Sequence, residues 1–360
     1  MSGTSFKSLS VWLAALACLV AAPAGAVSID MVTVGNPGNA NDTGGTNNGA
    51  VAYSYQIGMY DVTIGQYTAF LNAADPNGAN TNGIYNSLMG TDLNIAGISY
   101  TSGAAAGSKY AVIGPSGTAY GQTGANRPIT YVSWFNAARF ANWMTNGQGS
   151  GSTETGAYTL SGATSGNAVA ANPGAAFRLP TEDEWYKAAY YSPNYGGVGV
   201  PGYYAYATQS NSAPGNTGSD PNQANYITGA GYSVTQSNTD DPNQNYLTDV
   251  GAFSNSASFY GTFDQSGNVY QWNDLDGTAG SFRGLRGGDW RNYGGPSYLT
   301  SSGSFSGDPL YEYNDIGFRL VSPKSAVPEI DPATGSSALS LVAGVLTMIE
   351  QRRRRAAIVA

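Results

Sequence analysis

Apolar residues recur at helical spacing in three segments of this chain, and each segment follows a residue that typically caps a helix. The first begins after Thr63, which can form a capping box with Gln66. The second begins after Ser133 and ends before Gly147, and the third begins after Thr181. The apolar positions are Ile64, Tyr67, Phe70 and Leu71; Ala137, Phe140, Ala141 and Met144; and Trp185, Ala188 and Ala189. The pattern predicts three amphipathic helices whose apolar faces line a core.

Short runs rich in β-forming residues predict strands at 53–59, 282–286 and 316–321. Residues 77–126 and 147–173 are rich in Gly, Ser, Asn and Ala, so we expect irregular surface insertions there. The sequence contains no internal repeat of fixed period. Few strands, three helices and many loops together predict one compact α+β domain.

The N-terminus has the pattern of a secretory signal peptide over residues 1–26. Lys7 supplies a positive charge, an apolar run follows at 11–20, and Ala24-Gly25-Ala26 is a cleavage pattern of small residues. We therefore expect export and a mature start at Val27. The alternatives are a buried core segment, or a lipoprotein acylated at Cys18, although the residues before Cys18 match that signal poorly.

The C-terminus, residues 323–360, combines Val327-Pro328-Glu329, an apolar stretch at 336–349 and the block Arg352–Arg355. The apolar stretch barely covers a hydrocarbon core of about 30 Å, and the arginines would hold its end in the cytoplasm. This order of parts resembles the PEP-CTERM sorting signal of Gram-negative bacteria, although Ile330 stands where that motif has its second proline. The resemblance implies processing by exosortase-type sorting machinery, and a plain membrane anchor is the alternative. Both place the folded body at the cell surface, in the outer envelope or in the extracellular matrix.

Composition excludes several kinds of chemistry. The chain has no histidine, and its one cysteine lies in the predicted signal peptide. A Ser-His-Asp triad, a His-ligated metal, a catalytic thiolate and a disulfide are therefore excluded from the mature protein. Without Lys7, Glu350 and the four tail arginines, residues 27–331 hold 10 basic and 22 acidic residues, a net charge near −12. Nucleic acid is not an expected partner, because phosphate binding needs clustered Lys and Arg.

Six motifs follow one another along the body. They are YDVT (60–63), RPITYVSW (127–134), FRLPTEDEW (177–185), YGTFDQSGNVYQW (260–272), LRGGDW (285–290) and GFRL (317–320). In this order they resemble the sulfatase-modifying-factor domain of formylglycine-generating enzymes, over about residues 29–322. The resemblance implies a loop-rich variant of the C-type-lectin-like fold, in one domain at 27–322.

Two departures from the family remove its known reaction centres. Relative to Arg286-Gly287-Gly288, the cysteines that bind copper and attack the substrate fall at Asn292 and Ser297, and neither residue supplies a thiolate. A second branch of the family binds iron through histidines, which this chain lacks. We therefore expect neither copper nor iron, no catalytic residue of the known kind, and no formylglycine generation.

The resemblance also implies a Ca²⁺ site in the 264–271 loop. Its ligands would be Asp264, the carbonyl groups of Gly267 and Val269, and Gln271, which stands where the family usually has Glu. A second family site would begin at Asn225 and Tyr226. The alternative in each case is a tight turn without a metal ion.

Three arginines of the motifs, Arg178, Arg286 and Arg319, lie beside apolar residues and need carboxylate or carbonyl partners if they are buried. We expect Glu182 or Glu184 to supply one, and we expect the arginines to be structural.

Two functions of different class remain. The first is a non-catalytic module that binds an extracellular carbohydrate or protein through its Tyr- and Asn-rich loops. The second is an enzyme of unknown reaction, using carboxylates such as Asp289, Asp308, Glu312 and Asp315. Two facing carboxylates with raised pKa in one pocket would favour the enzyme, and an aromatic groove would favour binding.

Overall fold

A computed structural model describes residues 26–114, 124–292 and 295–323. Apart from Ala26 and Pro323, the predicted signal peptide and sorting signal lie outside the described residues. Within the described ranges, no helix has the length and apolar character needed to cross a membrane. The elements in chain order are β1 Met31–Val34, β2 Tyr55–Gly58, α1 Ile64–Ala74, α2 Leu88–Thr91, β3 Ile98–Tyr100, β4 Tyr110–Val112, α3 Trp134–Thr145, α4 Glu182–Tyr190, β5 Tyr191–Ser192, β6 Gly202–Tyr203, β7 Tyr270–Asn273, β8 Arg283–Arg286, the 3-10 helix η1 Gly295–Leu299, β9 Phe305–Gly307, β10 Ile316–Phe318 and β11 Val321–Ser322.

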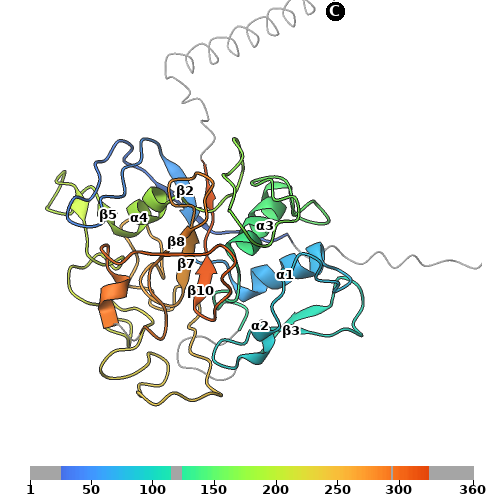
Figure 1. The fold of residues 1–360 in the computed structure, drawn as a ribbon. Coiled ribbons are helices and arrows are strands. Elements are labelled where there is room, and N and C mark those ends of the chain that lie inside the picture. Colours follow the sequence, from blue (N-terminus) through green and yellow to red (C-terminus); the bar gives the residue numbers. More distant parts are fainter. Residues whose placement is uncertain (1–25, 115–123, 293–294, 324–360) are drawn as a thin grey trace, which may run out of the picture.

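The central sheet has the strand order β10-β7-β8-β9. Figure 1 labels β10, β7 and β8 in the middle of the molecule. β10 runs parallel to β7, and the other neighbours are antiparallel. Because of these directions, the starts of β7, β9 and β10 and the end of β8 all lie at one edge of the sheet. This edge carries one of the cavities described below.

A second sheet, β1-β2-β11, joins the two ends of the body. Val32 and Val321 both pair with Ile57 of the middle strand, one from each side. The predicted strand at 316–321 is therefore two strands, because Phe318 pairs with β7 whereas Val321 pairs with β2. The chain changes sheet at Arg319 and Leu320.

The three predicted helices are confirmed as α1, α3 and α4, with the expected N-caps. Thr63 and Gln66 form both hydrogen bonds of a capping box, and Thr181 does the same with Glu184. Ser133 Oγ accepts a hydrogen bond from the backbone N–H of Asn136 at the start of α3.

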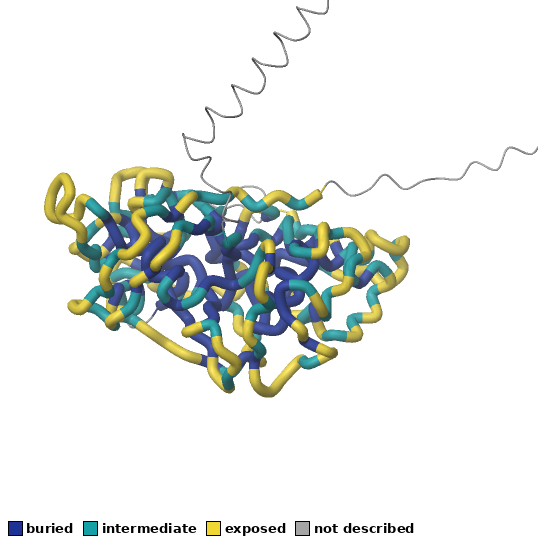
Figure 2. Tube along the Cα trace, turned by 90° about the horizontal axis from the view of Figure 1, so that it is seen from above, coloured by how far each residue is buried: buried dark blue, intermediate teal, exposed yellow. Residues whose placement is uncertain are grey.

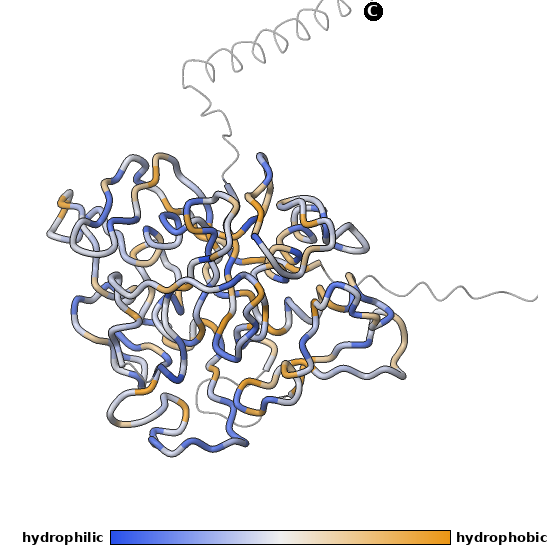
Figure 3. Tube along the Cα trace, viewed as in Figure 1, coloured by the Kyte–Doolittle hydropathy of each residue, from blue (hydrophilic) through white to orange (hydrophobic). Residues whose placement is uncertain are grey.

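The main core lies between α1, α3 and the central sheet. Phe70 and Phe140 meet edge to face with ring centroids 5.4 Å apart, and Phe318 of β10 lies 5.5 Å from Phe140. Buried residues concentrate in the middle of the molecule and exposed ones in the outer loops (Figure 2). Along the chain, hydrophobic residues come in short runs separated by polar ones (Figure 3), as expected where many loops contribute to one core. The α+β class in a single domain is confirmed.

The expectation of surface insertions was wrong in part. Residues 77–126 contain α2, β3 and β4, and Ile84, Met89, Ile98 and Tyr110 belong to the main core. Residues 147–173 form no helix or strand, yet Tyr158 is fully buried against Trp134. The composition of these segments indicated turns but concealed the few apolar residues that anchor them.

Arg178, Arg286 and Arg319 are buried or nearly so, and each of the three has a carboxylate partner. Arg178 binds Glu184 with two hydrogen bonds of 2.7 Å, and Arg286 pairs with Glu182. The predicted acidic partners are therefore confirmed for these two. Arg319 pairs with Asp61 at 3.2 Å. The Arg286–Glu182 pair joins β8 to α4, and the Arg319–Asp61 pair joins the segment after β10 to the segment after β2.

Candidate functional site

The predicted calcium loop, 264–271, runs into the start of β7, and its glutamine, Gln271, forms hydrogen bonds within the protein. Gln271 Oε1 accepts hydrogen bonds from Trp185 Nε1 at 2.6 Å and from Arg319 Nε at 2.7 Å. Gln271 Nε2 donates to the Asp264 carbonyl at 2.7 Å. Both acceptor sites of this amide oxygen are in use, so it does not offer a free ligand to a cation.

The positive charge beside this loop is the guanidinium group of Arg319. The Arg319 guanidinium also donates to the carbonyl groups of Phe263, at 2.7 Å, and Gly58, at 2.9 Å. The Asp264 carboxylate accepts from the backbone N–H of Gly251 at 2.6 Å, and burial raises its pKa to about 6.

The two predicted calcium segments touch each other. The Asn225 carbonyl accepts from the Asn268 N–H at 2.8 Å, and the Gly267 carbonyl accepts from the Val269 N–H at 3.0 Å. Gly267 has a positive φ of 85°, and a Cβ there would collide with the Asn225 carbonyl, so this contact requires glycine.

The remaining predicted ligand, Tyr226, points its carbonyl at Asn216 Nδ2, 3.1 Å away, and at Ser233 Oγ. In the part of the chain that the structure describes, no three His, Cys, Asp or Glu side chains form a group that could hold a metal ion. Of the predicted donors, Gln271 Oε1 and the carbonyl groups of Gly267, Asn225 and Tyr226 accept hydrogen bonds from other groups of the protein. In this arrangement the residues do not fit Ca²⁺.

The positions of the family's cysteines lie near the edge of the central sheet. Asn292 is buried, whereas Ser297, in η1, is exposed. Asn292 lines a cavity of about 370 Å³ together with Tyr270, Asp289, Arg291, Tyr298, Phe305 and Asp315. Burial, followed by the charge of Asp315, raises the pKa of Asp289 to about 7, and burial also raises the pKa of Asp315.

The other carboxylates considered for catalysis lie elsewhere. Glu312 accepts hydrogen bonds from Asn86 and Asn136, each at 2.8 Å, in a separate cavity. Asp308 Oδ1 accepts from the Leu310 N–H. The structure therefore brings together only Asp289 and Asp315 of the four.

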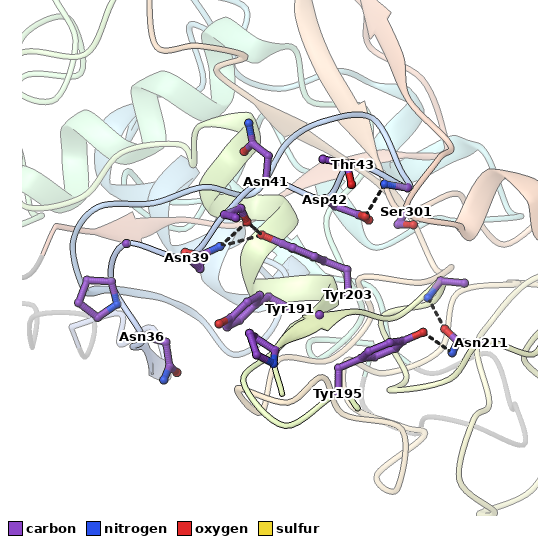
Figure 4. A pocket seen from close by; sticks show the side chains of 17 residues that line it. Asn36, Asn39, Asn41, Asp42, Thr43, Tyr191, Tyr195, Tyr203, Asn211 and Ser301 are labelled. Atoms are coloured by element: carbon purple, nitrogen blue, oxygen red, sulfur yellow. Dashed lines mark hydrogen bonds between the residues drawn. The ribbon is translucent and has the colours of Figure 1, made fainter. Parts of the chain in front are cut away.

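A groove of about 850 Å³ lies between the 36–44 loop and the β5–β6 hairpin (Figure 4). We call it the Tyr–Asn groove. Its walls carry Tyr191, Tyr195, Tyr203, Asn36, Asn39, Asn41, Asn211 and Asp42 among other residues. No Lys or Arg is among its lining residues.

Helix α4 positions the loop wall of this groove. Asp183 accepts a hydrogen bond from the Gly49 N–H at 2.7 Å, and the Tyr186 hydroxyl donates to Asp42 at 2.7 Å. Lys187 Nζ donates to the Asn36 carbonyl at 2.8 Å. These three residues have helical i, i+3, i+4 spacing and so form one face of α4. Asp183, in the acidic first turn of α4, therefore also holds the loop that forms this wall of the groove.

The tyrosine wall is fixed by amides (Figure 4). Asn39 Nδ2 donates to the Tyr203 hydroxyl at 2.7 Å, and that hydroxyl donates to the Ala40 carbonyl at 2.7 Å. At the other end, Asn211 Nδ2 donates to the Tyr195 hydroxyl at 2.8 Å. Tyr195 remains 38% exposed, so its ring is available to a ligand.

None of the motifs in the sequence predicts these groove residues. The density of asparagine at 36–48 and of tyrosine at 190–204 was a signal that could have indicated them. Their proximity could not be predicted, because it depends on the contacts between α4 and a loop more than 130 positions away in sequence.

The fold and these loops define an α+β protein of the C-type-lectin-like kind, with loops forming most of its surface. The chain belongs to the family of the sulfatase-modifying factor enzyme 1-like domain, whose model matches residues 17–324. No curated protein sequence matches it.

Several solved structures are similar to this chain. CarF is 22% identical, with 83% of this chain and 99% of that chain covered and a TM-score of 0.46. Treponema denticola variable protein 1 is 20% identical, with coverage of 83% and 96% and a TM-score of 0.48. PvdO from Pseudomonas aeruginosa is 19% identical, with coverage of 82% and 92% and a TM-score of 0.39.

Proposed function

We propose that this protein is an exported, non-catalytic binding module and that the Tyr–Asn groove takes a neutral carbohydrate. The observation that carries the proposal is the lining of the groove: tyrosine rings and asparagine amides, one carboxylate, and no basic side chain. Its volume of about 850 Å³ is within the usual range for a ligand site of 300–1,000 Å³.

The lining matches the chemistry of a sugar. A pyranose ring presents C–H groups on its faces and hydroxyl groups around its edge. Tyrosine rings pack against the first, and amides donate to and accept from the second. Asn36 Oδ1 accepts from the Tyr260 hydroxyl, and Asn41 Oδ1 from the Ala50 N–H. The Nδ2 groups of both make no hydrogen bond with other described residues and remain donors for a ligand.

Preorganisation also supports binding. Immobilising a side chain on binding costs about 0.5–1.5 kcal/mol, which reduces affinity. The hydrogen bonds to Tyr195 and Tyr203 hold both rings before any ligand arrives. The Asp42 carboxylate and the absence of lining Lys or Arg disfavour anionic ligands, including acidic glycans and nucleic acid.

The residues at the family's reaction centre support a non-catalytic role. Asn292 and Ser297 replace the two thiols, and the chain has no histidine to bind iron. Export rests on the signal-peptide pattern at 1–26. Display at the cell surface or in the matrix, after exosortase-type processing of a transient membrane segment, rests on the pattern at 323–360.

A glycan array tests this proposal. The protein should retain neutral oligosaccharides in preference to sulfated or sialylated ones. Tyr195→Ala should weaken binding of the best ligand at least fivefold, the effect of losing a contact of about 1 kcal/mol. Tyr313→Ala is the matched control, because Tyr313 is 51% exposed and lies outside the groove. Retention of acidic glycans alone, or equal losses in both variants, would contradict the proposal.

The second candidate is an enzyme, and Asp289 with Asp315 is the observation that favours it. Two carboxyls with raised pKa in one cavity suit general acid–base catalysis. The ligand found on the array should therefore be incubated with the protein and analysed by mass spectrometry. A product that forms with the native protein but not with Asp289→Asn would show that the protein is an enzyme and not a binding module.

A further inference from the structure

The cavity at the edge of the central sheet is built from all four strands of that sheet. Tyr270 begins β7, Phe305 begins β9, Asp315 immediately precedes β10, and Asp289 follows the end of β8. We infer that this cavity, of about 370 Å³, binds a monovalent organic cation such as a primary ammonium or guanidinium group. The inference is independent of the Tyr–Asn groove, which lies elsewhere on the molecule.

Charge is the first argument. The cavity contains two carboxylates and one guanidinium, and with both acids ionised its net charge is −1. Arg291 pairs with Asp315 at a nitrogen–oxygen distance of 3.6 Å, and the same Nη2 donates to Asn314 at 3.0 Å, so this single guanidinium balances one of the two carboxylates. A monovalent cation would bring the cavity to neutrality.

The second argument is an unused acceptor. Asp289 is only 4% exposed, and its Oδ1 accepts from the Arg291 N–H at 2.7 Å. Its Oδ2 has no hydrogen-bond partner among the described residues, although the side chain lines the cavity. Oδ2 is not enclosed by the protein, so it is open to the cavity and can accept a charge-assisted hydrogen bond from an N–H donor of a ligand.

Aromatic rings are the third argument. The centroid of the Phe305 ring lies 5.5 Å from that of Tyr270 and 5.0 Å from that of Tyr298. The faces of such rings attract cations, most strongly organic ones that shed water easily. Phe305 is 37% exposed in the free protein, as expected for a ring that a ligand covers.

A divalent metal suits the cavity less well. Ca²⁺ takes six to eight oxygen ligands, whereas this cavity supplies two carboxylates beside three rings and a guanidinium. The mixture of acids and rings instead matches an ammonium or guanidinium carried on an apolar stem, such as a lysine or arginine side chain of a peptide.

Ligand-observed NMR titration tests the inference on the full chain. The probe is Nα-acetyl-lysine methylamide, and Nα-acetyl-norleucine methylamide is its uncharged analogue. The lysine probe should bind and the norleucine probe should not. Asp289→Asn should weaken the lysine probe at least tenfold. Asp220→Asn, the same change at an exposed residue outside the cavity, should leave it unchanged. Equal binding of both probes, or no effect of Asp289→Asn, would overturn the inference.

Two further measurements keep the test decisive if Asp289→Asn does not fold. Phe305→Ala, at an exposed ring, should also weaken the lysine probe. With the native protein, affinity should fall about tenfold from pH 8 to pH 6, because protonation of Asp289 competes with the cation. The groups that face Asp289 are Asp315, Arg291, Tyr270 and Tyr298. A pH-independent affinity, or displacement of the probe by millimolar Ca²⁺ but not by methylammonium, would contradict an organic cation site.

Discussion

Glu184→Gln removes one charge in the first turn of α4, where Glu184 contacts Arg178 of the same motif and Tyr53, which precedes β2. The Glu184 carboxylate is fully buried and accepts four hydrogen bonds. Two come from Arg178 at 2.7 Å, one from the Thr181 N–H at 2.8 Å and one from the Tyr53 hydroxyl at 3.0 Å. All four bonds come from donor groups. The NH₂ group of a glutamine at this position must therefore face a donor instead of an acceptor.

The structure sets the size of the effect. Breaking a buried ion pair by removing one partner costs about 3–5 kcal/mol, because the other charge is left uncompensated. Arg178 is 13% exposed and can recover some hydration, so we expect the lower end, about 3 kcal/mol. A domain of about 300 residues has an unfolding entropy of about 0.6 kcal/mol per degree, so the melting temperature should fall by about 5 °C.

The assay is thermal and urea unfolding of the native protein, Glu184→Gln, Arg178→Gln and the double variant. The two single changes should be strongly non-additive, because each removes the same pair. Asp220→Asn, which removes one exposed charge, should move the midpoint by less than about 1 °C. A loss below about 1 kcal/mol in Glu184→Gln, or additive effects of the two changes, would refute the assignment of this pair as a structural tie.

The remaining predictions concern ions, chemistry, export and pH. Millimolar Ca²⁺ should leave the melting temperature unchanged relative to chelator, because the Gln271 amide oxygen already accepts two hydrogen bonds within the protein. A rise of several degrees that Asp264→Ala abolishes would show that the loop does bind Ca²⁺. A sulfatase-type cysteine peptide should not be oxidised, and turnover would contradict the assignment of Asn292 and Ser297. Mass spectrometry of native protein should show a start near Val27 and no arginine tail, and an intact Met1 would contradict export. Burial raises the pKa of Asp289 to about 7 and of Asp274 to about 6, so the folded state holds protons that the unfolded state has released. The stability that these two groups contribute is fully present below about pH 4 and is lost as the pH rises through about 6 and 7. Between pH 5 and pH 8 the two shifts should lower the free energy of unfolding by on the order of 4 kcal/mol, and a flat or rising curve in urea titrations would contradict this.

Local signals in the sequence predicted the helices well. Thr63, Ser133 and Thr181 cap them as expected, because capping depends only on residues within one turn. The pairing of the motif arginines with Glu182 and Glu184 was also predictable, since a buried guanidinium needs an acid and these lie in a motif beside one of them.

Contacts distant in sequence were not predictable in this way. Strands of two to four residues, such as β5 and β9, carry too little pattern to be distinguished from loop. The meeting of Asp289 and Asp315 follows from the parallel pairing of β10 with β7, which no local pattern encodes. The Tyr–Asn groove depends on Asp183, Tyr186 and Lys187, three residues that local reasoning assigns simply to a helix.

The affinity of the native protein for its best neutral oligosaccharide, measured by calorimetry at low and high salt, tests the central claim most directly. Binding in the Tyr–Asn groove predicts that 0.5 M NaCl leaves the affinity unchanged, since a neutral ligand has no charge to screen. It also predicts that Tyr195→Ala and Asn211→Ala each weaken binding at least fivefold while Tyr313→Ala does not. An affinity that falls steeply with salt, or that survives both groove substitutions, would contradict a carbohydrate site in this groove.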